Sequence, residues 1–109
     1  MTLNDLKNIL LSIGPPVFHY FATGQSGNYI VWAEDSEGNA LHADGKKAER
    51  AITGTIDYFT KDEDDPVVQQ IETMLDSDDG IAWQLNSVQY ERDTGYTHYE
   101  WVWEVDGVG

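Results

Sequence analysis

The sequence predicts a single α+β domain over residues 1–109, with an ordered core from about residue 3 to residue 106. Two observations lead to this fold class. Apolar residues recur at helical spacing in two segments and at strand spacing in five, in the order α-β-β-β-α-β-β. A chain of 109 residues with four tryptophans and six tyrosines can build one hydrophobic core, but hardly two. We therefore expect a mainly antiparallel sheet with two helices packed on one face.

The first helix is expected at the start of the chain, where leucines and isoleucines from Leu3 to Ile13 repeat at steps of three and four. Thr2 is the expected N-cap, because its hydroxyl can accept a backbone N–H, and Asp5 follows three residues later. Gly14 and the two prolines that follow it end this helix.

Three strands are expected next. The segments 17–22 and 29–33 are β-branched and aromatic, and a loop of hairpin length with two glycines joins them. The segment 52–59 alternates as a strand does, and Gly54 within it indicates a bulge or a close neighbour.

The second helix is expected to begin at Asp65, a good N-cap, with Pro66 in its first turn. It ends near residues 76–80, where three aspartates lie at the unfavourable end of the helix dipole. The pattern of the chain offers no folding reason for these three acids.

A hairpin closes the chain, with a turn at residues 93–95. The apolar alternation slips at Asn86 and Ser87, which predicts a bulge in its first strand. In its second strand the tryptophans face inward, while His98 and Glu100 face the other way. The predicted core consists of Leu6, Ile9, Leu10, Ile30, Trp32, Ile56, Ile71, Leu75, Trp83, Trp101 and Trp103.

The charge balance excludes several functions. Six Lys+Arg stand against twenty Asp+Glu, a net charge of −14, which argues against binding to nucleic acid or to an anionic membrane. The chain has no cysteine, so disulfides and thiolate catalysis are excluded. Its longest apolar run is far too short to span a bilayer.

No catalytic, cofactor or metal site is predicted. The acidic run 62–65 does not have the spacing of a calcium-binding EF-hand loop, so a solvated loop is the better interpretation. His19, His42 and His98 lack the spacing of metal ligands. His19 and His98 could meet across adjacent strands, but a surface or half-buried role for each is favoured.

One feature of the charge pattern points to an interface. Lys46, Lys47 and Arg50 make up half of all the cations and lie within five residues. They form either a solvated turn or a contact with an acidic patch of an identical subunit, and both interpretations carry similar weight. The candidate acidic partners are Asp62, Glu63, Asp64, Asp76, Asp78 and Asp79.

Four stretches carry a family resemblance. The sequences ITGTIDYFTK (52–61), LNSVQYE (85–91) and THYEWVWE (97–104), with the opening GPPVF (14–18), resemble small proteins from the head–tail gene region of tailed phages and Firmicutes prophages. These proteins are called tail-terminator, tail-completion or minor capsid proteins. The likeness extends from about Leu3 to Val105.

The resemblance implies a structural virion protein and no enzyme. Such proteins form rings, typically hexamers, that cap the tail tube and contact tail-tube and neck proteins at the head–tail junction. They are made in the cytoplasm of the bacterial host. An acidic ring suits this role, because a negatively charged lumen repels DNA and lets the DNA slide through the ring without sticking. The alternatives are an acidic DNA mimic that inhibits a host defence enzyme, and a calcium-dependent binding module.

Overall fold

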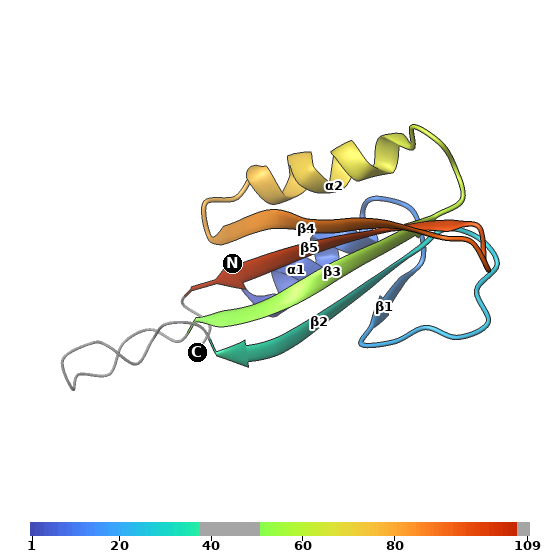
Figure 1. Cartoon of the computed structure of the whole chain (residues 1–109). Helices are drawn as coiled ribbons and strands as arrows, with labels where there is room; N and C mark the ends of the chain where they lie inside the picture. Colours follow the sequence, from blue (N-terminus) through green and yellow to red (C-terminus); the bar gives the residue numbers. More distant parts are fainter. Residues whose placement is uncertain (38–50, 107–109) are drawn as a thin grey trace, which may run out of the picture.

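The structure, a computed structural model, describes residues 1–37 and 51–106. Its elements follow the predicted order. They are α1 (Leu3–Leu11), β1 (Val17–His19), β2 (Tyr29–Glu37), β3 (Ile52–Thr60), α2 (Pro66–Asp76), β4 (Ile81–Glu91) and β5 (Tyr96–Val105). The five strands form one sheet in the order β1-β2-β3-β5-β4, and both helices pack on one of its faces (Figure 1). The chain is an α+β protein, as predicted.

The first strand pair differs from the expected hairpin. β1 has only three residues and lies parallel to β2, so that Val17 is opposite Ile30 and His19 is opposite Trp32. Residues 20–28 return the chain to the start of β1 before β2 begins. A strand of three residues spans only about 10 Å, so a short loop can make this return. The prediction of a hairpin here was wrong; the other strand pairs are antiparallel.

The N-caps of both helices form as predicted, whereas α1 ends earlier than expected, at Leu11 with Ser12 as its C-cap. Thr2 and Asp5 make a reciprocal capping box, in which each side chain accepts the other residue's backbone N–H. Asp65 caps α2 by accepting the backbone N–H of Val67 at 2.9 Å. Its second carboxylate oxygen accepts the hydroxyls of Tyr58 at 2.6 Å and Thr60 at 2.7 Å. Asp65 therefore joins the start of α2 to the end of β3.

The core lies between the helices and the inner face of the sheet. Nine of the eleven predicted core residues are buried, while Ile9 and Trp83 are only half-buried. Trp83 lies on the edge strand β4, where its indole N–H donates to Asp76 at 3.1 Å. Three further side chains are fully buried, Tyr58, Thr60 and Val105.

Gly54 is needed because of a close neighbour, as the sequence indicated. A Cβ at this position would collide with the carbonyl oxygen of Ala33 and with the indole of Trp103. A bulge also occurs beside it, between Glu34 and Ser36 of β2. The Trp103 ring therefore occupies the space that a side chain at position 54 of β3 would fill.

The C-terminal hairpin agrees with the prediction. The register of β4 shifts between Leu85 and Ser87, which is the expected bulge. Gly95 adopts a positive φ of 79° in the turn, and its N–H donates to Glu91. Trp101 and Trp103 face inward and are buried, so they belong to the core.

Candidate functional site

The face of the sheet that carries no helix, the helix-free face, holds a cluster of aromatic rings. Alternation along the strands directs Tyr29, Phe59, Tyr96 and His98 to this face. The Phe59 ring stacks on Tyr29 at 4.6 Å between centroids and on His98 at 4.2 Å. Tyr96 meets both Tyr29 and Phe59 edge-on. Four aromatic rings from four positions on three strands therefore form one continuous surface.

This aromatic surface borders a hollow of about 310 Å³, which we call the aromatic hollow. The segment that follows β1 forms one side of it, and strands β2, β3 and β5 form the rest. Phe21, in that segment, is 73% exposed and is the most exposed large apolar residue described. The lining residues are Tyr20, Phe21, Ala22, Tyr29, Val31, Asp57, Phe59 and His98.

Two titratable groups of the hollow are paired. His98 Nε2 lies 2.6 Å from Asp57 Oδ1, and both side chains are largely buried. The hydrogen bond to Asp57 raises the pKa of His98; burial opposes this shift, while the charges of Asp57, Glu91 and Glu100 add to it. Neither serine nor threonine is among the residues that line the hollow.

The structure separates the two histidines that could have met. His19 lies on edge strand β1, faces the helix side and stacks on Trp32 at 4.1 Å. His98 lies on β5 and faces the opposite side, with β2 and β3 between the two strands. His19 instead contacts Glu34. The favoured interpretation of the sequence, a surface or half-buried role for each histidine, is confirmed, because His19 is exposed and His98 is half-buried.

The acidic loop before α2 is held by the fold at one end. Asp62 accepts the side-chain amide of Asn28 at 2.8 Å, and its backbone N–H donates to Thr60. Glu63 and Asp64 are exposed, and Asp64 adopts a positive φ of 51°. The carboxylates of Asp62, Glu63 and Asp64 therefore lie on the surface at the N-terminal end of α2.

The acidic cluster after α2 has a folding role that the sequence did not reveal. Asp76 accepts the indole N–H of Trp83, and Asp78 accepts the backbone N–H of Gly80 at 2.7 Å. Asp79 is exposed. The first two acids thus fix the turn into β4, which explains why they follow the helix.

The structure does not bring the acidic residues of the loop before α2 (62–64) close to those that follow α2 (76–79). They lie at opposite ends of α2, whose 11 residues correspond to a length of about 16 Å. Lys46, Lys47 and Arg50 lie outside the described residues.

Exposed apolar side chains gather at the two edges of the sheet. Leu85, Val88 and Tyr90 lie along edge strand β4, with exposed fractions between 41% and 66%. Tyr20 and Phe21 directly follow the other edge strand, β1. We call these sets the β4-edge patch and the β1-edge patch. The outer side of β4 also offers eleven residues of backbone without a neighbouring strand among the described residues.

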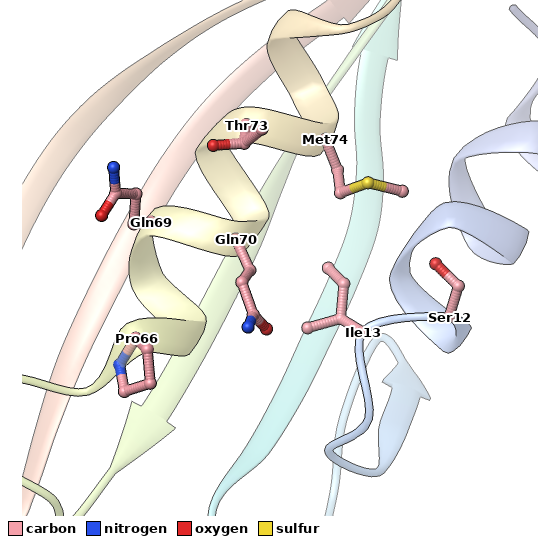
Figure 2. A pocket seen from close by; sticks show the side chains of 7 residues that line it. All are labelled: Ser12, Ile13, Pro66, Gln69, Gln70, Thr73 and Met74. Atoms are coloured by element: carbon pink, nitrogen blue, oxygen red, sulfur yellow. The ribbon is translucent and has the colours of Figure 1, made fainter.

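A groove of about 660 Å³ lies between the end of α1 and the outer side of α2. Figure 2 shows Met74 and Gln70 of α2 facing Ile13 across this groove, while Gln69 points away. Its lining has no charged side chain, and the hydroxyl of Ser12 already donates to a backbone oxygen. The groove therefore offers a concave surface with side-chain amide groups, but no acidic or basic side chain lines it.

Neither a metal cluster nor a membrane span is found in the described part of the chain. No group of three histidine, aspartate or glutamate side chains there could hold a metal ion. No described helix is long and apolar enough to cross a membrane.

The fold and its surfaces define an acidic α+β protein with an aromatic helix-free face and apolar sheet edges. No model of a known protein family matches the chain, and no curated protein matches it either.

Sequence reasoning missed the pair of Asp57 and His98. The alternation of each strand directs both residues away from the core, and that signal was readable. What was not readable is the register, which places Asp57 opposite Glu100 and beside His98, 41 positions away in the chain.

Proposed function

We propose that the chain is a structural protein of a tailed phage or prophage particle. In this role it is a tail terminator or head–tail joining protein, and identical subunits form a ring at the end of the tail tube. The resemblance of three strand segments to such proteins supports this role, and so does the α+β order. The ring model places the protein in the virion at the head–tail junction, and in the cytoplasm of the host during assembly.

The observation that carries the proposal is the position of the exposed apolar side chains. Five of the six large ones described belong to the β4-edge patch or the β1-edge patch, at opposite edges of one sheet. Two different patches on opposite sides of a subunit suit head-to-tail association, which closes into a ring when the rotation allows it. Aromatic and aliphatic side chains of this size are the usual anchors of protein interfaces.

The distribution of acids favours this role over DNA mimicry. A mimic needs rows of carboxylates spaced like phosphates on one face. Here the acidic turns lie at the two ends of α2, and Asp65, Asp76 and Asp78 are engaged in contacts that hold the fold. In a ring, a net charge of −14 per subunit would repel DNA from the lumen.

Sedimentation of two edge variants tests the head-to-tail arrangement. Phe21→Lys disrupts the β1-edge patch and Val88→Lys the β4-edge patch; both side chains are exposed, so both variants should fold. Under conditions where the wild type forms rings, with or without tail-tube protein, each variant alone should remain monomeric. An equimolar mixture should form dimers, because each partner supplies one intact patch. Rings from either single variant, or a mixture that stays monomeric, would contradict this arrangement.

Tail assembly tests the biological role. A phage that carries Val88→Lys in this gene should produce tails of irregular length that fail to join heads. The matched control is Gln89→Lys, which adds the same charge at the neighbouring position on the other face of β4. Normal particles from both variants would reject the proposed role.

A further inference from the structure

We propose that neighbouring subunits join through their sheet edges, with β4 of one subunit pairing as an antiparallel strand with β1 of the next. This pairing rests on the head-to-tail arrangement proposed above and specifies how the two edges meet. Backbone hydrogen bonds then cross the junction, and one sheet continues from subunit to subunit. Figure 1 shows the two strands at opposite edges of the sheet.

The two edge strands lie in the parts of the sequence that carry no charge. Lys, Arg, Asp and Glu make up 24% of the chain, yet none occurs in residues 8–33, which include β1, or in residues 80–90, which include all of β4 except Glu91. These are the two longest uncharged stretches of the chain. Because each subunit has a net charge of −14, a second copy meets the least repulsion where one uncharged edge faces the other. The distribution of charge therefore favours a second copy as the occupant of each edge.

Strand β4 lacks most of the features that block an exposed sheet edge. Blocked edges are short, or carry lysine, proline, a bulge or an inward-pointing charge. β4 has eleven residues, with no lysine or proline among them. A bulge interrupts its pairing between Leu85 and Ser87, but the register from Ser87 to Glu91 is regular. This regular part carries Val88 and Tyr90, whose side chains are 51% and 66% exposed, so it offers both backbone and apolar surface.

Strand β1 has two residues whose backbone groups point to its free side. The carbonyl of Pro16 and the N–H of Tyr20 both form hydrogen bonds with β2, each 2.8 Å long. Alternate residues of a strand direct their backbone groups to the same side, so Val17 and His19 direct theirs away from β2. Among the described residues, no strand lies on that side. An added strand can therefore form about four hydrogen bonds with these two residues.

The end of β4 has the matching pattern of backbone groups. The carbonyl of Glu91 accepts the N–H of Gly95 in the hairpin turn, so it points toward β5. By the same alternation, the backbone groups of Val88 and Tyr90 point away from β5, to the free side of the sheet. Each edge therefore presents two residues, spaced two positions apart, that can exchange hydrogen bonds with the other edge.

The directions of the strands permit antiparallel pairing. β1 and β2 are parallel, whereas each later neighbour in the sheet is antiparallel to the strand before it. β4 therefore runs opposite to β1 within one subunit. A rotation about an axis that lies along the strands keeps these directions, so β4 meets β1 of the next subunit antiparallel. Antiparallel pairing is the more stable of the two kinds.

One register places both exposed apolar side chains of the end of β4 against β1. It sets Tyr90 opposite Val17. Val88 then lies opposite His19, and all of these side chains are on the helix side of the sheet. A shift of two residues in either direction would leave Tyr90 or Val88 without a partner on β1.

Disulfide trapping tests this register, because the chain has no cysteine of its own. In this register Phe18 lies opposite Gln89, and both face the helix-free side. The two test mixtures are Phe18→Cys with Gln89→Cys, and His19→Cys with Val88→Cys. Under mild oxidation both mixtures should form disulfide-linked dimers of the two variants, because directly opposite residues of antiparallel strands have Cα atoms about 4.5–5.5 Å apart. Mass spectrometry distinguishes these dimers from linked copies of one variant.

Exchanging the partners gives matched controls from the same four proteins. Phe18→Cys with Val88→Cys, and His19→Cys with Gln89→Cys, combine residues on opposite faces of the sheet. These mixtures should link at least about tenfold less, because side chains on opposite faces cannot reach the geometry of a disulfide. The unfolding midpoints of all four variants are first compared with that of the wild type. Equal linking of the test and exchanged mixtures, or no linking in any mixture, would overturn the strand pairing.

Hydrogen exchange separates the strand pairing from the ring itself. The amides of Val88, Tyr90 and His19 point to the free sides of their strands, so they should exchange quickly in the monomer. In assemblies detected by sedimentation they should exchange at least about tenfold more slowly. Assemblies in which these amides remain unprotected would overturn the pairing and leave the ring proposal intact. If the wild type does not assemble, the ring proposal fails, and the cross-links between mixed monomers decide the edge contact by themselves.

Discussion

At the scale of single residues, two side chains explain much of what is specific in this fold. Trp103 packs against Gly54 and is only 3% exposed, although its indole N–H has no hydrogen-bond partner among the described residues. His98 joins β5 to Asp57 on the helix-free face. Each of these side chains makes contacts that depend on the register of a neighbouring strand.

Trp103→Ala should lower the free energy of unfolding by about 3–5 kcal/mol, because it removes a large buried side chain and leaves a cavity over Gly54. Trp103→Phe should lower it much less, since it keeps an aromatic ring and removes the unpaired N–H. Urea unfolding of the purified monomers provides the measurement. An unchanged midpoint for Trp103→Ala would show that this side chain contributes little to the core.

The raised pKa of His98 predicts a dependence of stability on pH. A pKa that is higher in the folded state than in the unfolded state means that the fold holds the proton more tightly. The stabilisation is then fully present below about pH 6.5, the unfolded value, and is lost as the pH rises through the folded value. Wild type should therefore exceed His98→Gln in unfolding free energy by more at about pH 5.5 than at about pH 8.5. An equal difference at both pH values would contradict this prediction.

At the scale of elements, the join between β3 and α2 depends on one side chain. Burial raises the pKa of the Asp65 carboxyl, but hydrogen bonds from Tyr58, Thr60 and the backbone of Val67 outweigh it, and the net shift is downward. Burial, together with the hydrogen bond to Asp65, raises the pKa of Tyr58. These shifts agree with a carboxylate that is charged in the folded protein.

Asp65→Ala should lower the free energy of unfolding by about 2–4 kcal/mol, because it removes the helix cap and leaves two hydroxyls at the base of α2 without their acceptor. The control is Thr2→Ala, the exposed cap of α1, whose hydroxyl accepts the backbone N–H of Asp5 in the same helix; it should lower the free energy of unfolding by about 1 kcal/mol. Thermal unfolding followed by circular dichroism measures both. Equal losses would show that the contacts of Asp65 with β3 add nothing to its capping role.

At the scale of the whole molecule, the net charge of −14 opposes self-association. We expect the free protein to be monomeric at low salt and low concentration, and to form rings when salt screens the charges or the tail tube templates them. In such a ring, isolated exposed ion pairs contribute only about 0–1 kcal/mol each, so they select the register while the apolar edge patches provide the affinity.

The charge reversal Lys46→Glu with Lys47→Glu tests whether these cations contact an acidic turn of the next subunit. Asp62, Glu63 and Asp64 or Asp76, Asp78 and Asp79 are the expected partners. A phage that carries the double variant should lose control of tail length. Tails of normal, uniform length that join to heads would reject this contact.

The elements could be predicted from the sequence because their signals are local. The capping residues Thr2 and Asp65, the apolar period of each helix and the phase slip at Asn86 act within a few residues. Each feature depends on the backbone immediately beside it, so a short stretch of chain is enough to specify it.

Only the tertiary structure decided how these elements meet. The parallel pairing of β1, the contact of Asp57 with His98 and the two apolar edges depend on strand order and register, which no short segment of the chain encodes. The sequence alone determined which faces of the strands are inward, because burial of apolar surface sets that choice residue by residue. Long-range packing decided which outward-facing residues become neighbours. The candidate sites of this protein lie where such residues come together.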